Sequence, residues 1–240
     1  MNFITIGNKK NPAVLFLHGW GGEIDSWGVI PYRIAGFGFY SIVVDFPGFG
    51  CSAEPLRAYG VEDYAVEIND LLKSLNVKDC AIVAHSFGGR VAIKMAVLHK
   101  NMISRLILVD SAGVRPRRGL IYKYKVWSYK RVKRKLQKGL ITSDKLKLYG
   151  SSDYRALSSI MKATFCRVVN EDLLNDAKNI DCKTLLIWGR NDRSTPLYMA
   201  RKLKGAIKGS RLEIYDAGHF SYLECLERFI DEIYMFIISS

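Results

Sequence analysis

The sequence predicts an α/β fold: a mostly parallel, doubly wound sheet of about seven strands with an inserted helical lid. Short runs of apolar or β-branched residues recur along the chain, and most are continuously apolar, which is typical of strands buried on both faces of a parallel sheet. Helical patterns separate these runs, as in doubly wound folds. The alternation fails once, between Asp110 and Lys183, where helical stretches occur without a convincing strand.

The strands are predicted from the apolar runs in chain order, at residues 3–6, 13–17, 40–45, 80–84, 105–110, 184–189 and 211–215. Between them, residues 61–75 form a helical pattern whose apolar stripe contains Tyr64, Ile68, Leu71, Leu72 and Leu75. The segment after Ser86 and the segment 196–205 are also predicted to be helices. Thr195-Pro196 is a good start for the second one, because proline suits the first turn of a helix.

The domain organisation follows from the single break in the alternation. A chain of 240 residues can form one sizeable core and a small insertion. We expect residues 1–112 and 181–240 to form the core and residues 113–180 to form the helical lid. A long block without strands inside an α/β pattern is best explained as such an insertion.

Composition narrows the class of protein. Hydrophobic residues make up 49% and charged residues 25% of the chain, which argues against disorder. No apolar run has the length of a signal peptide or a membrane span. The five cysteines form no C-x-x-C pair and the four histidines form no H-E-x-x-H motif, so neither a metal site nor a disulfide framework is expected. We expect reduced thiols, a cytoplasmic location and no cofactor.

The segment 83–89, VAHSFGG, places a polar serine and two glycines between a predicted strand and a predicted helix. A sharp turn there would hold Ser86 above the carboxyl edge of the sheet, with room only for small residues at Ala84 and Gly88. The sequence A-H-S-F-G resembles the nucleophile elbow G-x-S-x-G of the α/β-hydrolase superfamily, with alanine at the first glycine. By this resemblance Ser86 is the nucleophile; the alternative is a helix N-cap.

The resemblance also implies an acid and a histidine after the serine, in that order. Asp192 follows the strand 184–189, and His219 follows the strand 211–215 as the only histidine downstream of Asp192. Imidazole, with a pKa of about 6.5, can accept the serine proton while a carboxylate orients the ring. Asp110 is the alternative acid, and we expect it to be structural because Asp192 occupies the commoner site.

Two further stretches support the resemblance. LFLHGWGG (15–22) is similar to the HG-x oxyanion loop of the superfamily, which implies that the backbone amides of Trp20 and Phe87 bind the oxyanion. VVDFPGFGCS (43–52) is similar to its D-x-P-G-x-G-x-S turn. His18 is expected to make a structural hydrogen bond, and His85 to point away from the pocket.

A dinucleotide-binding site was weighed as an alternative from another class. Residues 48–53 fit G-x-G-x-x-A after a strand, but that motif needs a helix to begin at once, and Pro55 disfavours one. An aspartate nucleophile, as in epoxide hydrolases and dehalogenases, is disfavoured because position 86 is serine.

The net charge of +13 is concentrated in one segment. Residues 115–138 contain eleven Lys or Arg and no Asp or Glu, and the rest of the chain holds 25 basic against 23 acidic residues. We favour a lid helix within 115–139 whose charges meet water and whose apolar stripe covers the pocket. The alternatives are contact with an anionic membrane surface and guidance of an acidic substrate. Nucleic-acid binding is not expected.

The function implied is a serine hydrolase that cleaves a small to medium, largely apolar carboxylic ester through an acyl-enzyme. The expected partner is thus a small-molecule acyl substrate. Candidate pocket residues from the lid are Tyr122, Tyr124, Trp127 and Met161. The same triad serves thioesterases, lactonases, peptidases and meta-cleavage product hydrolases, so these stay open. A non-catalytic ligand-binding protein on the same fold is the alternative from a different class.

Overall fold

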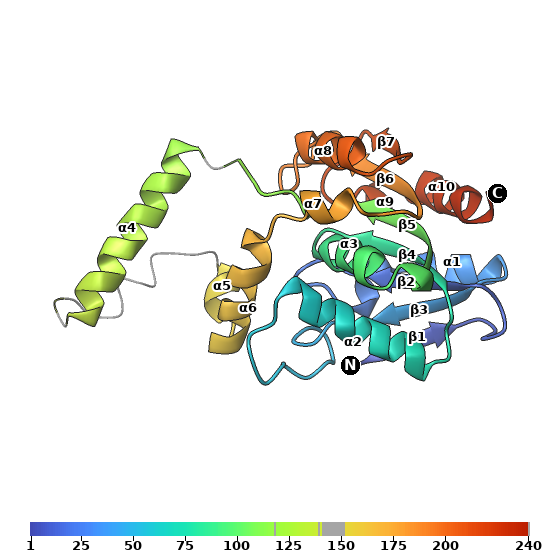
Figure 1. Cartoon of the computed structure of the whole chain (residues 1–240), viewed down its shortest axis with the longest axis horizontal. Coiled ribbons are helices and arrows are strands. Elements are labelled where there is room, and N and C mark those ends of the chain that lie inside the picture. Colours follow the sequence, from blue (N-terminus) through green and yellow to red (C-terminus); the bar gives the residue numbers. More distant parts are fainter. Residues whose placement is uncertain (118, 139, 141–151, 240) are drawn as a thin grey trace.

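The computed structural model describes residues 1–117, 119–138, 140 and 152–239. Its seven strands form one sheet in the order β1-β3-β2-β4-β5-β6-β7 (Figure 1). Only β1 is antiparallel to its neighbour among these pairs. The strands are β1 (Phe3–Ile6), β2 (Ala13–Leu17), β3 (Tyr40–Val44), β4 (Cys80–His85), β5 (Ile103–Val109), β6 (Lys183–Gly189) and β7 (Arg211–Tyr215). All seven predicted strands are therefore confirmed, with β5 beginning two residues earlier than expected.

Helices cover both faces of the sheet, which explains why the central strands are almost entirely apolar. Alternate residues of β2 enter different cores: Leu15 packs with α2, α3 and α8, whereas Phe16 packs with α1 and α10. The helices are α1 (Ile30–Gly36), α2 (Val61–Ser74), α3 (Phe87–Leu98), α8 (Tyr198–Ala206), α9 (Ser221–Glu224) and α10 (Leu226–Ile238), with single 3₁₀ turns at Ile24–Trp27 and Lys100–Met102. The helix predicted from Pro196 begins at Tyr198.

The described part of the segment between β5 and β6 is helical where it is regular, as predicted. It contains α4 (Leu120–Gln137), α5 (Ser152–Ala156), α6 (Ser159–Asn170) and α7 (Leu174–Ala177). Helix α6 lies against the body, where the Thr164 hydroxyl accepts a 3.0 Å hydrogen bond from the Tyr59 amide. Helix α4 stands away from the sheet and its covering helices (Figure 1). The division into a core and a lid at residues 112 and 181 stays a prediction.

The order of the strands places a crevice above β2 and β4. These two strands are neighbours and parallel, while the chain leaves β2 for β3 on one side and enters the β4–β7 half on the other. In open α/β sheets, ligands bind at such a switch point, outside the carboxyl ends of the strands. The loops that follow β2 and β4 carry His18 and Ser86, so the topology brings the two predicted motifs together.

Candidate active site

Ser86 occupies the turn between β4 and α3 in a strained conformation. Its φ of +50° and ψ of −111° lie outside the regions that side-chain-bearing residues normally adopt. Such a conformation costs about 1–3 kcal/mol and persists only where the surroundings enforce it. Two backbone hydrogen bonds hold the turn in place. The Ser86 amide donates to the Val109 carbonyl at 3.0 Å, and the Gly88 amide donates to the His18 carbonyl at 3.1 Å.

Two glycines make this turn possible because β2 and β5 pass close behind it. A Cβ at Gly88 would overlap the carbonyl oxygen of Leu17 and lie 2.7 Å from that of His18. A Cβ at Gly89 would overlap the side chain of Ser111. Ala84, by contrast, is fully buried in β4, so the alanine that departs from the superfamily pattern fits its site.

The structure brings the three predicted catalytic side chains together. His219 Nε2 lies 3.2 Å from Ser86 Oγ, and His219 Nδ1 lies 2.8 Å from Asp192 Oδ2. These residues follow β4, β6 and β7, whose carboxyl ends share one edge of the sheet. With the Nδ1 proton donated to the carboxylate, Nε2 is free to accept the serine proton.

The carboxylate of Asp192 is held by its own loop. Oδ1 accepts from the amides of Ser194 at 2.7 Å and Thr195 at 3.0 Å, and Oδ2 lies 2.6 Å from the Thr195 hydroxyl. Burial alone would raise the pKa of Asp192, but the hydrogen bonds from His219 and Thr195 outweigh it and hold the pKa below its usual value. The carboxylate is therefore ionised at neutral pH. Thr195 was predicted only as a helix start, and its hydrogen bond to Asp192 was not foreseen from the sequence.

Asp110, the alternative acid, joins three loops instead. Its carboxyl accepts from the Gly189 amide at 2.7 Å, the Ser221 amide at 3.1 Å and the Ser221 hydroxyl at 2.5 Å. Burial raises its pKa to about 7. The described hydrogen bonds thus connect Asp110 to the backbone around the site, whereas Asp192 contacts the imidazole.

The loop after β2 lies directly against the nucleophile. A Cβ at Gly19 would lie 3.3 Å from that of Ser86, so the backbone that leads into Trp20 approaches the reacting atom closely. His18 fixes this loop: its Nδ1 donates to the Gly19 carbonyl at 2.7 Å, and its Nε2 accepts from the Phe46 amide at 3.1 Å. Burial lowers the pKa of His18 to about 4, so the ring is neutral. Within the described loops and turns, no backbone acceptor is found for the amides of Trp20 and Phe87.

Two cavities meet at Ser86 and Trp20. The first, of about 400 Å³, is mainly apolar and extends under α6; its other lining residues include Phe87, Arg90, Val114, Phe165, Val168 and Met199. The second, of about 460 Å³, is lined by the glycines of the loop after β2 and by His85, His219, Phe220 and Tyr222. A substrate can therefore extend to both sides of the serine hydroxyl.

His85 corrects an expectation from the sequence. Its side chain lines the second cavity and does not point away from the site, and its Nε2 lies 2.8 Å from the His219 carbonyl oxygen. The two imidazole rings are 4.8 Å apart between centroids. Burial lowers the pKa of His85 to about 3, so a neutral ring supports the loop that carries His219.

The predicted pocket residues whose side chains the structure describes do not line either of these two cavities. Tyr124 and Trp127 are 66% and 54% exposed on α4, which stands away from the body (Figure 1). Met161 is buried in the main core on the sheet side of α6. The side chain of Tyr122 lies outside the described residues. The cavity instead receives Phe165 and Val168, one and two turns after Met161, so the apolar stripe of α6 was the signal that the sequence analysis overlooked.

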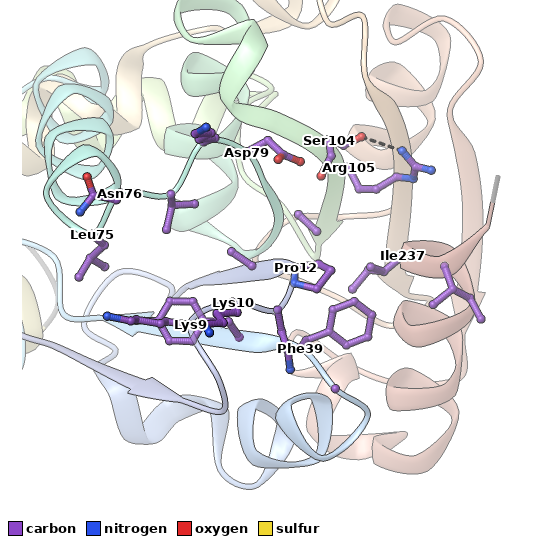
Figure 2. Close-up of a pocket in the computed structure, with 18 residues that line it drawn as sticks. Lys9, Lys10, Pro12, Phe39, Leu75, Asn76, Asp79, Ser104, Arg105 and Ile237 are labelled. Carbon is purple, nitrogen blue, oxygen red and sulfur yellow. Dashed lines mark hydrogen bonds between the residues drawn. The ribbon is translucent and has the colours of Figure 1, made fainter.

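A further cavity lies remote from Ser86. It measures about 720 Å³ and lies at the amino ends of the strands, where its lining includes Pro12, Tyr40 and Ser104. Figure 2 shows Lys9, Lys10, Asp79 and Arg105 around it. The switch point and the assembled side chains both favour the carboxyl end, so we place the candidate active site at Ser86.

The described residues contain neither a candidate metal cluster nor a candidate membrane-spanning helix. No cluster of three or more His, Cys, Asp or Glu side chains there could hold a metal ion. None of the described helices combines the length and apolar character needed to cross a membrane.

Comparisons with known proteins were made for the whole chain. Residues 14–232 match the alpha/beta hydrolase family. The 2-hydroxy-6-oxo-6-phenylhexa-2,4-dienoate hydrolase of Comamonas testosteroni is 26% identical, over 92% of this chain and 85% of that protein. Epoxide hydrolase 3 of Xenopus tropicalis is 34% identical, but over only 46% of this chain and 30% of its own length. An esterase from Exiguobacterium antarcticum superposes with a TM-score of 0.77 at 25% identity, covering 99% of this chain and 95% of that one.

Proposed function

Because the chain belongs to the alpha/beta hydrolase family, we propose that it is a serine hydrolase that cleaves a small to medium, largely apolar carboxylic ester. The observation that carries this proposal is the continuous contact from Asp192 through His219 to Ser86, at 2.8 and 3.2 Å. A helix N-cap needs neither an imidazole nor a carboxylate, and the Ser86 side chain makes no capping hydrogen bond. This arrangement is what a serine nucleophile requires.

The proposed reaction passes through an acyl-enzyme. His219 Nε2 removes the proton from Ser86 as its Oγ attacks the ester carbonyl carbon, and the imidazolium then gives that proton to the leaving alcohol. The ionised Asp192 stabilises the imidazolium. The amides of Trp20 and Phe87 bind the oxyanion, and losing one such donor typically raises the barrier by about 3 kcal/mol. Water, activated by His219, then releases the acid and restores Ser86.

The substrate class is supported by the cavities and by one relative. The 400 Å³ cavity is large enough for a short acyl chain, and Phe165, Val168 and Met199 give it an apolar lining. The similar structure from Exiguobacterium antarcticum is described as an esterase.

Carbon–carbon bond hydrolysis is the second candidate. It is favoured by the similarity, over 92% of this chain, to the dienoate hydrolase of Comamonas testosteroni. The same serine, histidine and oxyanion donors would serve that reaction, because it too releases an acyl group to water.

The test is hydrolysis of p-nitrophenyl esters of graded chain length, from acetate to decanoate, by the wild-type protein and by Ser86→Ala. We expect the wild type to favour short and medium chains, and the variant to lose at least about 10³-fold in kcat/KM. A circular dichroism spectrum of each protein checks the fold. Equal rates from the two proteins would reject catalysis by Ser86. Hydrolysis of a 2-hydroxy-6-oxo-dienoate in preference to every ester would favour the second candidate.

A further inference from the structure

Arg90 is a buried cationic residue that borders the cavity beside the nucleophile. It lies in α3, and its side chain lines the 400 Å³ cavity together with Ser86, Trp20 and Phe87. Only 4% of the residue is exposed. Arg90 follows Ser86 by four residues, in the first turn of α3, and both residues border this cavity.

The guanidinium has little compensation for its burial. Its recorded partner is one neutral acceptor, the backbone carbonyl of Glu171, at 2.7 Å from Nη1. The Glu171 carboxylate contacts Lys94 instead, at 3.5 Å, and Lys94 also binds Asp176 at 2.9 Å. No ion pair found within the described ranges includes Arg90.

The charge is nevertheless retained at neutral pH. Burial lowers the pKa of Arg90 to about 10, and the nearby charges of Glu171 and Asp172 oppose that shift. A guanidinium offers five N–H donors in a planar fork that matches a carboxylate. Burying such a group without an anionic partner is costly, so a buried arginine in a substrate cavity indicates an anionic ligand.

Two further basic residues flank a residue that lines the cavity. Pro116 contributes to the lining, and its neighbours Arg115 and Arg117 are exposed. They begin the cationic segment that continues into α4. This agrees with the hypothesis, made from charge alone, that the segment guides an acidic substrate toward the site.

Building on the proposed function, we propose that Arg90 binds a carboxylate carried by the substrate, so that the enzyme prefers esters with a second, ionised acid group. The apolar wall of the cavity, from Phe165 to Met199, then holds the carbon chain between the two ends. Mono-esters of dicarboxylic acids are thus the predicted substrate class.

Two ester pairs test this proposal. The first is mono-p-nitrophenyl adipate against p-nitrophenyl hexanoate, which places the charge on the acyl side. The second is 4-carboxyphenyl butyrate against phenyl butyrate, which places it on the alcohol side. For each pair and each protein, kcat/KM for the charged ester is divided by kcat/KM for the neutral ester. Comparing this charged-to-neutral ratio between variant and wild type cancels the difference in intrinsic reactivity between the two esters. The rate with Ser86→Ala is subtracted as background.

We expect Arg90→Met to reduce the charged-to-neutral ratio by about 10- to 100-fold in at least one pair, as loss of a hydrogen bond to a charged group would. Arg90→Lys keeps a positive charge and should retain part of the preference. Lys94→Met is the matched control, because Lys94 lies on the same helix but binds Glu171 and Asp176; its ratio should not change.

If the charged-to-neutral ratio of Arg90→Met equals that of the wild type in both pairs, the proposal is overturned. Arg90 would then serve only to hydrogen-bond the Glu171 carbonyl. If Arg90→Met does not fold, inhibition of ester hydrolysis by the wild-type protein tests the proposal instead. Adipate should inhibit more strongly than uncharged adipamide. Equal inhibition by the two compounds would overturn the proposal. Failure of the proposed function would give a different result from failure of this proposal. In that case Ser86→Ala would hydrolyse every ester at the same rate as the wild type.

Discussion

Ser86 and Asp110 both have positive φ where neighbouring strands end, but their side chains make different contacts. At Ser86, with φ of +50°, the strain projects the hydroxyl toward His219. At Asp110, with φ of +43°, the carboxyl turns into the protein and binds Gly189 and Ser221. The two acidic residues near the site therefore have separable roles, with Asp192 acting on the imidazole and Asp110 on the surrounding loops.

Substitution of the two acids should separate activity from stability. Asp192→Asn should lower kcat on a p-nitrophenyl ester by about 10³- to 10⁴-fold, because the amide favours the wrong imidazole tautomer. Asp110→Asn should lower kcat by less than tenfold but reduce the free energy of unfolding, because an amide nitrogen faces donors at Gly189 and Ser221. Ester kinetics and urea unfolding of both variants measure this. A larger loss of kcat in Asp110→Asn than in Asp192→Asn would show that Asp110 is the catalytic acid residue that orients His219.

The position of a single side chain could be predicted where a sequence motif fixes the backbone. It could not be predicted where tertiary packing determines the direction of the side chain. Ser86 was proposed from its glycines and His219 from its order in the chain, and the two side chains lie in contact. The contact of His85 with His219 was mispredicted, because a residue that precedes the turn can face either loop and the sequence does not show which. Arg90 was overlooked because nothing in a helical pattern distinguishes a cavity-lining arginine from a solvated one.

The turn from β4 into α3 is the element on which the site depends. Gly88→Ala should destabilise the protein by several kcal/mol and abolish activity, because the new Cβ would overlap the Leu17 carbonyl and backbone cannot easily yield. Ala84→Gly is the control: it restores the superfamily glycine and should cost only about 1 kcal/mol. Thermal unfolding and ester hydrolysis compare the two. A fully active and stable Gly88→Ala would show that the turn is not tightly constrained.

Helix α4 is the element whose role the sequence left most open. Its described basic residues are exposed, as are Tyr124 and Trp127, and Arg131 stacks over the Trp127 ring at 5.4 Å. A helix that combines exposed aromatic rings with many cations is suited to an anionic lipid surface. The sequence predicted the helix from its periodicity but could not show what its apolar stripe faces, since periodicity carries no information about the partner.

Vesicle sedimentation tests the alternative in which α4 contacts an anionic membrane surface; if α4 does so, the following results are expected. The protein should sediment with vesicles containing phosphatidylserine at low salt, and binding should fall in 0.5 M NaCl or with neutral phosphatidylcholine vesicles, because salt screens the attraction. Lys130→Glu combined with Arg134→Glu should weaken binding without loss of ester hydrolysis. Equal sedimentation with both lipids would contradict the expectation.

At the scale of the whole molecule, two buried neutral histidines make stability depend on pH. Burial lowers the pKa of His18 to about 4 and that of His85 to about 3, whereas both are near 6.5 when unfolded. Below pH 6.5 the unfolded chain binds protons that the folded chain does not, so these residues reduce stability as the pH falls toward 4. Asp110 acts in the opposite direction: its pKa of about 7 contributes stability that is lost as the pH rises through 7.

His18→Gln isolates one of these contributions. The variant loses the ring's hydrogen bonds and should be less stable than the wild type at pH 7.5. The difference should shrink by up to about 3 kcal/mol between pH 6.5 and 4.5, because only the wild type is destabilised by protonation of residue 18. Urea unfolding at several pH values measures the difference. A constant difference across that range would show that His18 does not titrate as expected.

The architecture as a whole was well determined by the sequence, because continuous apolar runs admit few arrangements other than strands covered on both faces. The switch point between β2 and β4, which brings the loop after β2 next to Ser86, follows from that arrangement. The pocket was not predictable in the same way. Its wall comes from α6, and the aromatic side chains expected there lie on α4, so the direction of each helix mattered more than its composition.

Labelling with a fluorophosphonate tests the central claim most directly, because the reagent reacts with a serine only when that serine is activated. We predict one adduct per chain, located by peptide mass spectrometry at Ser86, absent from Ser86→Ala and formed at least about 100-fold more slowly by His219→Gln. An adduct at another residue, or labelling that proceeds equally fast without His219, would contradict an active site built from Ser86, His219 and Asp192.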